Sequence, residues 1–99
     1  MKLIYVCSPY RGNFNVNVRN AQKACRTIVE GGNIPIAPHL YFPQFMNEET
    51  ERELALEFNK CLIEICDKFY VFGSEISEGM QIEIAYANSI GKKVMYCGI

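Results

Sequence analysis

The sequence predicts a small α/β domain in which helices cover both faces of a parallel sheet of about four strands. Short, β-prone apolar runs alternate along the chain with segments of helical periodicity. Glycine, proline and asparagine mark most of the short connections between them. The resulting order, β-α-β-α-β-α-β, is typical of a parallel sheet because each parallel strand needs a crossover helix. The 99 residues are expected to form a single domain, 1–99.

The first half of the chain predicts two strands and one helix. A continuous β-prone run over residues 2–7 suits a buried parallel strand, and Ser8-Pro9 ends it. Helical periodicity runs from about residue 15 to 30, and Gly31-Gly32 closes the helix. Residues 33–37 form a short second strand whose Pro35 indicates an edge position. On the helix, the apolar face is expected to comprise Val18, Ala21, Cys25, Ile28 and Val29, and a solvated charged face Arg19, Lys23 and Arg26.

The second half predicts two helices and two strands. Residues 38–45 are too rich in aromatic residues and proline for a regular element. A helix is expected over residues 48–66, with a buried side made of Leu54, Phe58, Cys61, Leu62 and Ile65. Strands are expected over 69–72 and 92–97, on either side of a helix that begins near Ser77 and stops at Gly91.

Composition excludes several classes of function. The net charge of −1 argues against nucleic-acid polymers and acidic membranes, since no basic excess is present to neutralise phosphates. Five cysteines without CxxC spacing are interpreted as buried thiols, and a single histidine makes a zinc site unexpected. The apolar run at the N-terminus is too short for a signal peptide or a membrane span. A soluble, reduced, cytoplasmic protein that binds a small molecule without metal or cofactor is therefore expected.

Unusual residues gather where the predicted strands end. In a Rossmann- or flavodoxin-like sheet, ligands bind at the carboxyl ends of the strands, near the point where the crossover direction changes. The loops after the first three strands, residues 8–13, 38–45 and 73–79, are therefore expected to converge on one site.

Two of these loops suit an anion. Ser8, Arg11 and Gly12 combine a hydroxyl, a planar guanidinium and an unhindered backbone, although an exposed turn with a solvated arginine is the alternative. Ser77 and Gly79 open a helix, where free N–H groups and the helix dipole favour negative charge. The alternative for Ser77 is an ordinary N-cap.

Glu83 lies one turn beyond Gly79 and is flanked by apolar residues. It is either a catalytic carboxylate with a raised pKa or an exposed helix residue. Tyr5 is either a core aromatic or a buried hydroxyl that needs a partner. His39 and the aromatic residues that follow it form either the wall of a ligand site or a hydrophobic flap.

As a set, these motifs resemble the nucleoside 2-deoxyribosyltransferase-like superfamily, especially its short phage and bacterial members. The resemblance spans almost the whole chain. It is carried by residues 4–12 (IYVCSPYRG), 35–39 (PIAPH), Cys66-Asp67, and 76–80 (ISEGM) together with Glu83.

The resemblance implies roles for individual residues. Glu83 corresponds to the family's nucleophile, which attacks C1′ of the sugar, and Tyr5 to the tyrosine that holds it. Ser8, Arg11, Gly12, Ser77 and Gly79 correspond to positions that bind or adjoin a 5′-phosphate, and Tyr10 and His39 are expected beside the base or sugar. The implied function is cleavage or transfer at the N-glycosidic bond of a (deoxy)nucleoside 5′-monophosphate.

The chain departs from the family pattern at Asn59, where an aspartate that helps to protonate the leaving base is expected. An amide binds through hydrogen bonds but supplies no titrating proton. This departure favours an alternative function, that of a nucleotide-binding protein without turnover. A third interpretation is a module that binds a partner through residues 38–45. Family members often complete the site from a neighbouring subunit, and this sequence ends at Ile99, so a homodimer or higher oligomer is also expected.

Overall fold

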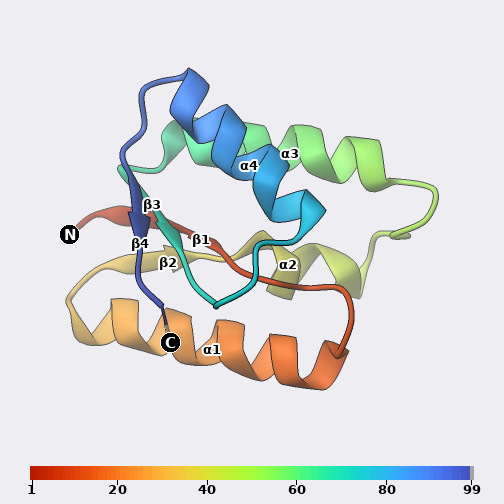
Figure 1. Ribbon diagram of the computed structural model, residues 1–99, viewed down its shortest axis with the longest axis horizontal. Helices are drawn as coiled ribbons and strands as arrows, with labels where there is room; N and C mark the ends of the chain where they lie inside the picture. Colours follow the sequence, from red (N-terminus) through yellow and green to blue (C-terminus); the bar gives the residue numbers. More distant parts are fainter. Residues whose placement is uncertain (99) are drawn as a thin grey trace.

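The computed structural model describes residues 1–98, which form a four-stranded, fully parallel sheet in the order β2-β1-β3-β4. Helix α1 covers one face of the sheet, and α3 and α4 cover the other (Figure 1). The predicted fold class is confirmed. The elements are β1 (Leu3–Cys7), α1 (Phe14–Glu30), β2 (Ile34–Ile36), α2 (Pro38–Tyr41), the short 3-10 helix η1 (Phe42–Gln44), α3 (Arg52–Ile65), β3 (Lys68–Val71), α4 (Glu78–Ser89) and β4 (Val94–Tyr96).

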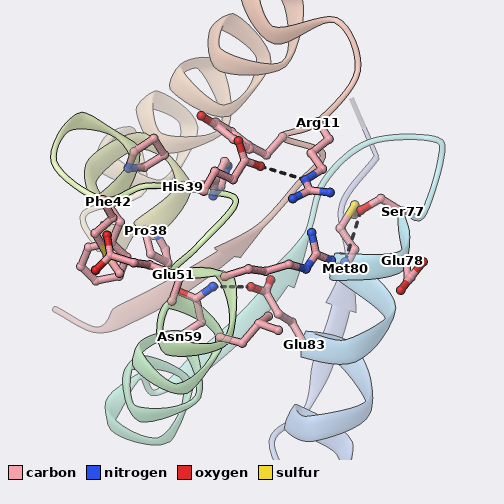
Figure 2. A pocket seen from close by; sticks show the side chains of 18 of the residues that line it. Arg11, Pro38, His39, Phe42, Glu51, Asn59, Ser77, Glu78, Met80 and Glu83 are labelled. Atoms are coloured by element: carbon pink, nitrogen blue, oxygen red, sulfur yellow. Dashed lines mark hydrogen bonds and ion pairs between the residues drawn. The ribbon is translucent and has the colours of Figure 1, made fainter.

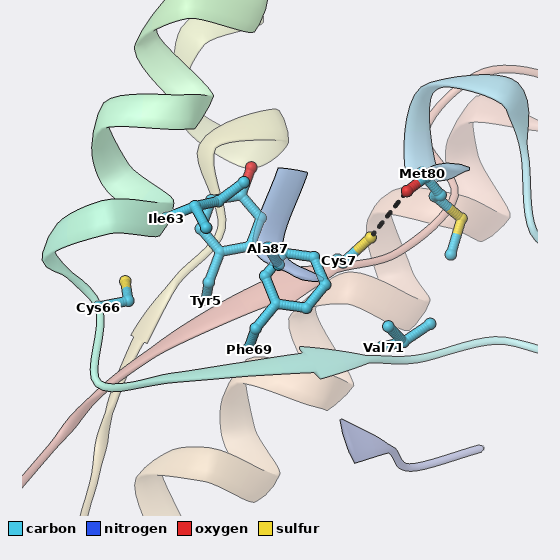
Figure 3. Close-up of a cluster of buried hydrophobic side chains, with 8 residues drawn as sticks. All are labelled: Tyr5, Cys7, Ile63, Cys66, Phe69, Val71, Met80 and Ala87. Carbon is cyan, nitrogen blue, oxygen red and sulfur yellow. Dashed lines mark hydrogen bonds between the residues drawn. The ribbon is translucent and has the colours of Figure 1, made fainter. Parts of the chain in front are cut away.

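Strand register decides which side chains face which helices. Tyr5 is aligned with Ile36 on one side and with Phe69 on the other, and its ring stacks on that of Phe69 at 5.2 Å. Side chains at matched positions of neighbouring strands share a face, so Tyr5 lies under α3 and α4. Figure 3 shows the apolar cluster on this face, formed by Tyr5, Cys7, Ile63, Cys66, Phe69, Val71, Met80 and Ala87. Pro35 lies in edge strand β2, as its missing N–H predicts.

The helix ends follow local sequence signals. Gly32 and Gly91 adopt positive φ values of 81° and 79° just beyond α1 and α4, a conformation that glycine adopts without strain. Asp67 accepts a hydrogen bond from the backbone of Leu3 at 2.8 Å, which ties the start of β3 to β1. No helix among residues 1–98 has both the length and the apolar character needed to cross a bilayer.

The prediction that residues 38–45 are irregular was wrong, because α2 and η1 occupy this segment. Pro38 and Pro43 each lie in the first turn of one of these short helices, where the missing proline N–H is not needed. Helix α3 begins at Arg52 rather than near residue 48. The Asn47 side chain accepts backbone hydrogen bonds from Glu49 and Thr50, which holds a turn before the helix.

The predicted buried side of α3 was also wrong in part. Its fully buried residue is Ile63, whereas Leu54 is 46% exposed and Ile65 is 62% exposed. Helix α3 carries an inner apolar stripe that contains Ile63 and faces the sheet, and an outer apolar stripe made of Leu54, Phe58, Cys61 and Ile65. The outer stripe lies on the surface. The homo-oligomer that the sequence analysis expects stays a prediction.

On α1 the buried residues are Ala21, Ala24 and Ile28, while Val29 is exposed. Arg19, Lys23 and Arg26 are exposed, as expected.

The interpretation of the cysteines as buried thiols holds for two of them. Cys7 is buried in β1 and Cys66 at the C-cap of α3, Cys25 is half-buried, and Cys61 and Cys97 are exposed. All five thiols are free. Cys61 lies on α3, and Cys97 lies just beyond edge strand β4.

Candidate active site

A cavity of about 320 Å³ lies at the carboxyl ends of the central strands (Figure 2). Its lining includes Ser8 from the loop after β1, Pro38 from the segment after β2, and Ser77 from the loop after β3. The predicted convergence of three loops is thereby confirmed. Helix α3 adds Arg52, Ala55, Leu56 and Asn59, which recur at intervals of three or four residues and so share one face.

Glu83 is the most constrained carboxylate in this cavity. Its Oε2 accepts hydrogen bonds from the Tyr5 hydroxyl at 3.0 Å and from Asn59 Nδ2 at 2.9 Å. Figure 2 shows Asn59 and Glu83 facing each other from α3 and α4. Two donors on one oxygen fix the orientation of the carboxylate, while its other oxygen has no partner among residues 1–98.

Burial raises the pKa of the Glu83 carboxyl above its ordinary value of 4.5. The hydrogen bonds from Tyr5 and Asn59, together with the nearby Cys7 thiol, act in the opposite direction, because they stabilise the charged form. The pKa of the Tyr5 hydroxyl is raised well above 10.0, first by burial and then by the neighbouring Glu83. Tyr5 therefore stays protonated and continues to donate to the carboxylate at neutral pH.

The raised pKa of Glu83 predicts that Glu83→Gln stabilises the fold at neutral pH. Because the folded pKa lies above the unfolded one, the contribution of Glu83 to wild-type stability is greatest in acid and is lost as the pH rises through the folded pKa. Glutamine keeps an acceptor for Tyr5 and Asn59 but has no proton to lose. We expect the variant to be more stable by about 1 kcal/mol at pH 7. Urea unfolding of both proteins from pH 4 to pH 8 measures the difference, which should shrink toward acid; a constant difference would contradict this assignment.

Ser8 and His39 form a second polar pair in the lining. Ser8 Oγ lies 2.7 Å from His39 Nε2, and the Ser8 side chain is buried. Burial lowers the pKa of His39 to about 4, so the imidazole is neutral at pH 7. Tyr10 packs edge-on against His39, with ring centroids 6.3 Å apart. Both residues predicted beside the base or sugar therefore line the cavity, next to Phe42.

The aromatic segment after β2 has one side toward the cavity and one side toward the surface. Pro38, His39, Phe42 and Pro43 line the cavity. Tyr41 and Phe45 are 60% and 61% exposed and pack against each other on the outside. The segment is thus a wall on one side and an exposed aromatic surface on the other.

Arg11 reaches the cavity from the loop after β1. Its Nε donates to Glu48 Oε1 at 2.8 Å, and both side chains are exposed. Asn17 holds the loop from α1 by donating to the carbonyls of Tyr10 and Arg11. Gly12 lies outside the lining and turns the loop with a φ of 98°; its predicted contact with a phosphate stays a prediction.

The start of α4 contributes Ser77 and Gly79 to the cavity wall. Ser77 is the N-cap, and its Oγ accepts a hydrogen bond from Met80 N at 3.3 Å. Ser77 is therefore an N-cap, as the alternative interpretation of the sequence predicts. It lies exposed at the positive end of the helix dipole. A Cβ on Gly79 would have no heavy atom within 4 Å, so this stretch of backbone is open.

Sequence reasoning missed several lining residues, notably Met46, Glu48, Glu51 and Arg52. The helical spacing of Arg52 and Ala55 from Asn59 was a usable signal. The turn before α3 carried no comparable sequence signal, because its position depends on the Asn47 side chain and on the Arg11–Glu48 pair.

Residues 2–97 match the sequence profile of a family described as a domain of unknown function (DUF7768). The chain belongs to this family. No curated protein matches it. The DUF7768 chain is similar to a solved 2-deoxyribosyltransferase from the psychrotolerant bacterium Bacillus psychrosaccharolyticus, with a TM-score of 0.76 and 20% identity over 97% of this chain and 72% of the other. The fold of this DUF7768 member is therefore nucleoside deoxyribosyltransferase-like, as the sequence resemblance implied.

Proposed function

We propose that this protein cleaves or transfers the N-glycosidic bond of a nucleoside 5′-monophosphate, with Glu83 as the nucleophile. The observation that carries the proposal is the Glu83 carboxylate, oriented by Tyr5 and Asn59 within a cavity at the carboxyl ends of the strands. A carboxylate held in this way can attack C1′ and form a glycosyl ester, which water or a second base then resolves. The similar solved structure is described as a biocatalyst for nucleoside synthesis, which supports the reaction class.

The residues around Glu83 suit the parts of such a substrate. Arg11, Ser77 and Gly79 contribute a guanidinium and a helix N-terminus to the cavity lining, which favours a phosphate. Tyr10, His39 and Phe42 offer flat surfaces for a base. Ser8 and its partner His39 offer polar atoms for a sugar hydroxyl or the phosphate.

The Arg11–Glu48 pair predicts opposite effects of two substitutions. If Arg11 holds the 5′-phosphate, Arg11→Gln should weaken binding of the nucleotide about tenfold or more and leave the matching nucleoside unaffected. Glu48→Gln should release Arg11 and tighten nucleotide binding a few-fold, since an exposed ion pair contributes at most about 1 kcal/mol. Calorimetry with a nucleoside monophosphate and its nucleoside measures both effects. Equal losses for nucleotide and nucleoside in Arg11→Gln would remove Arg11 from the phosphate site.

The reaction itself is tested by incubating the protein with a panel of nucleoside 5′-monophosphates, ribose and deoxyribose forms alike. Chromatography should detect free base, and addition of a second base should reveal any transfer.

Asn59 favours a second candidate, a nucleotide-binding protein without turnover, because it places an amide where an acid is expected. In that case calorimetry would register binding of a nucleotide that is recovered intact.

A further inference from the structure

The cavity contains a nucleophile but no evident acid for the leaving base. A neutral purine or pyrimidine leaves as an anion unless a proton reaches it in the transition state. Asn59 has no titrating proton, and its Nδ2 is engaged with Glu83. Tyr5 donates its hydroxyl proton to the same carboxylate, and its raised pKa makes it a poor acid.

The remaining acids of the lining are engaged elsewhere or exposed. Glu48 is paired with Arg11, and Glu51 accepts a hydrogen bond from Asn47 N at 2.8 Å. Glu78 is exposed in the first turn of α4.

His39 is a further titratable group of the lining. Its pKa of about 4 leaves it neutral at pH 7, and its Nε2 is already hydrogen-bonded with Ser8. Among residues 1–98, therefore, no lining side chain combines an available acidic proton with a position beside Glu83.

The charged side chains of the cavity lining also carry a net negative charge. Its lining carries four glutamates, Glu48, Glu51, Glu78 and Glu83, against two arginines, Arg11 and Arg52. An excess of acidic groups around a concave site attracts cations. A cationic substrate beside Glu83 would also compensate a half-buried negative charge whose hydrogen-bond donors, Tyr5 and Asn59, are both neutral.

We propose that the substrate is an N-glycoside whose base carries a fixed positive charge, such as a pyridinium or an N7-alkylpurinium nucleotide. This inference rests on the proposed function and specifies its substrate class. Asn59 is then suited to the reaction, because the leaving base needs no acid. The amide orients Glu83, and its Oδ1, which is buried without a partner among residues 1–98, remains as an acceptor.

The chemical step balances without a proton donor. A Glu83 carboxylate oxygen forms a bond to C1′ while the bond from C1′ to the ring nitrogen breaks. The bonding electron pair stays on that nitrogen and cancels the positive charge, so the base leaves neutral. Water then attacks C1′, the ester bond breaks to restore the carboxylate, and the proton of the water passes to solvent. Opposite charges are neutralised in the first step, which a poorly solvated site favours.

A matched pair of substrates tests the inference. Guanosine 5′-monophosphate and its 7-methyl derivative differ by one methyl group and one fixed charge, and each is used in ribose and deoxyribose form, with nicotinamide mononucleotide as a pyridinium probe. Base release is followed by chromatography, and the rate with Glu83→Gln is subtracted as background. We expect the 7-methyl compound to react at least about a hundredfold faster, the scale of a general acid's contribution.

The outcomes separate the two proposals. Equal enzymatic rates for the methylated and unmethylated nucleotides would overturn the cationic substrate and leave the glycosidic function standing. Absence of Glu83-dependent release from every compound would overturn both.

Asn59→Asp provides an independent test. An aspartate beside Glu83 would share a proton with it, since two adjacent carboxylates do not both ionise readily. In this variant, the ratio of the release rate of the methylated nucleotide to that of the unmethylated one should fall about tenfold or more, mainly because guanine is released faster. Asn59→Ala should slow both substrates together, because it only removes a donor to Glu83. An unchanged preference in a folded Asn59→Asp protein would overturn the inference.

Discussion

Glu83→Gln is expected to reduce base release by at least about a thousandfold, which corresponds to about 4 kcal/mol of transition-state stabilisation. Glutamine retains the acceptor that Tyr5 and Asn59 need, so the variant should fold, but its amide oxygen is a far weaker nucleophile. The measurement is single-turnover release of base, followed by chromatography, with the best substrate of the nucleotide panel.

Glu75→Gln is the matched control, because Glu75 is exposed in the loop before α4 and lies outside the cavity lining. It should retain the wild-type rate. If Glu83→Gln and Glu75→Gln released base equally fast, Glu83 could not be the nucleophile.

Tyr5→Phe is expected to lower kcat about ten- to hundredfold while KM changes little. Phenylalanine keeps the stacking on Phe69 and removes only the hydroxyl that donates to Glu83. A hydrogen bond to a charged group is worth about 1.5–3 kcal/mol, which sets this range. Loss of the donor also raises the pKa of Glu83 further.

The pH profile distinguishes this role from a general loss of packing. Glu83 must be ionised to attack, so the acid limb of kcat against pH should move to higher pH in Tyr5→Phe. Tyr70→Phe is the control, because Tyr70 packs on the α1 side of the sheet. A rate loss in Tyr5→Phe with an unmoved acid limb would assign Tyr5 a purely structural role.

The order of elements could be predicted from the sequence because local signals and the sheet agree. The apolar run of β1 favours a buried parallel strand, the proline of β2 favours an edge strand, and the serine before α4 favours a helix N-cap. The buried face of α3 could not be predicted, since its two apolar stripes are similar and only contact with the sheet chooses between them. Ile63 faces inward and Leu54 outward for that reason.

The residues that line the cavity could be predicted from the sequence mainly where the family resemblance names them. The contact of Tyr5 with Glu83 joins residues 78 positions apart, and periodicity alone does not specify it. The pairing of Arg11 with Glu48 depends on how the turn before α3 is held, so the sequence could not indicate that the expected phosphate ligand already has a carboxylate partner.

The central claim is that the Glu83 carboxylate forms a bond to the sugar. The most direct measurement uses a 2′-fluoro analogue of the best substrate. The fluorine slows both chemical steps, and a good leaving base on the analogue lets the glycosyl ester accumulate. Protein is quenched in acid during turnover and examined by mass spectrometry. We predict that the 5′-phosphorylated sugar is attached through C1′ to the peptide that contains Glu83, and that this adduct forms at the rate of base release. Stoichiometric release of base with that peptide unmodified at every quench time would contradict the account.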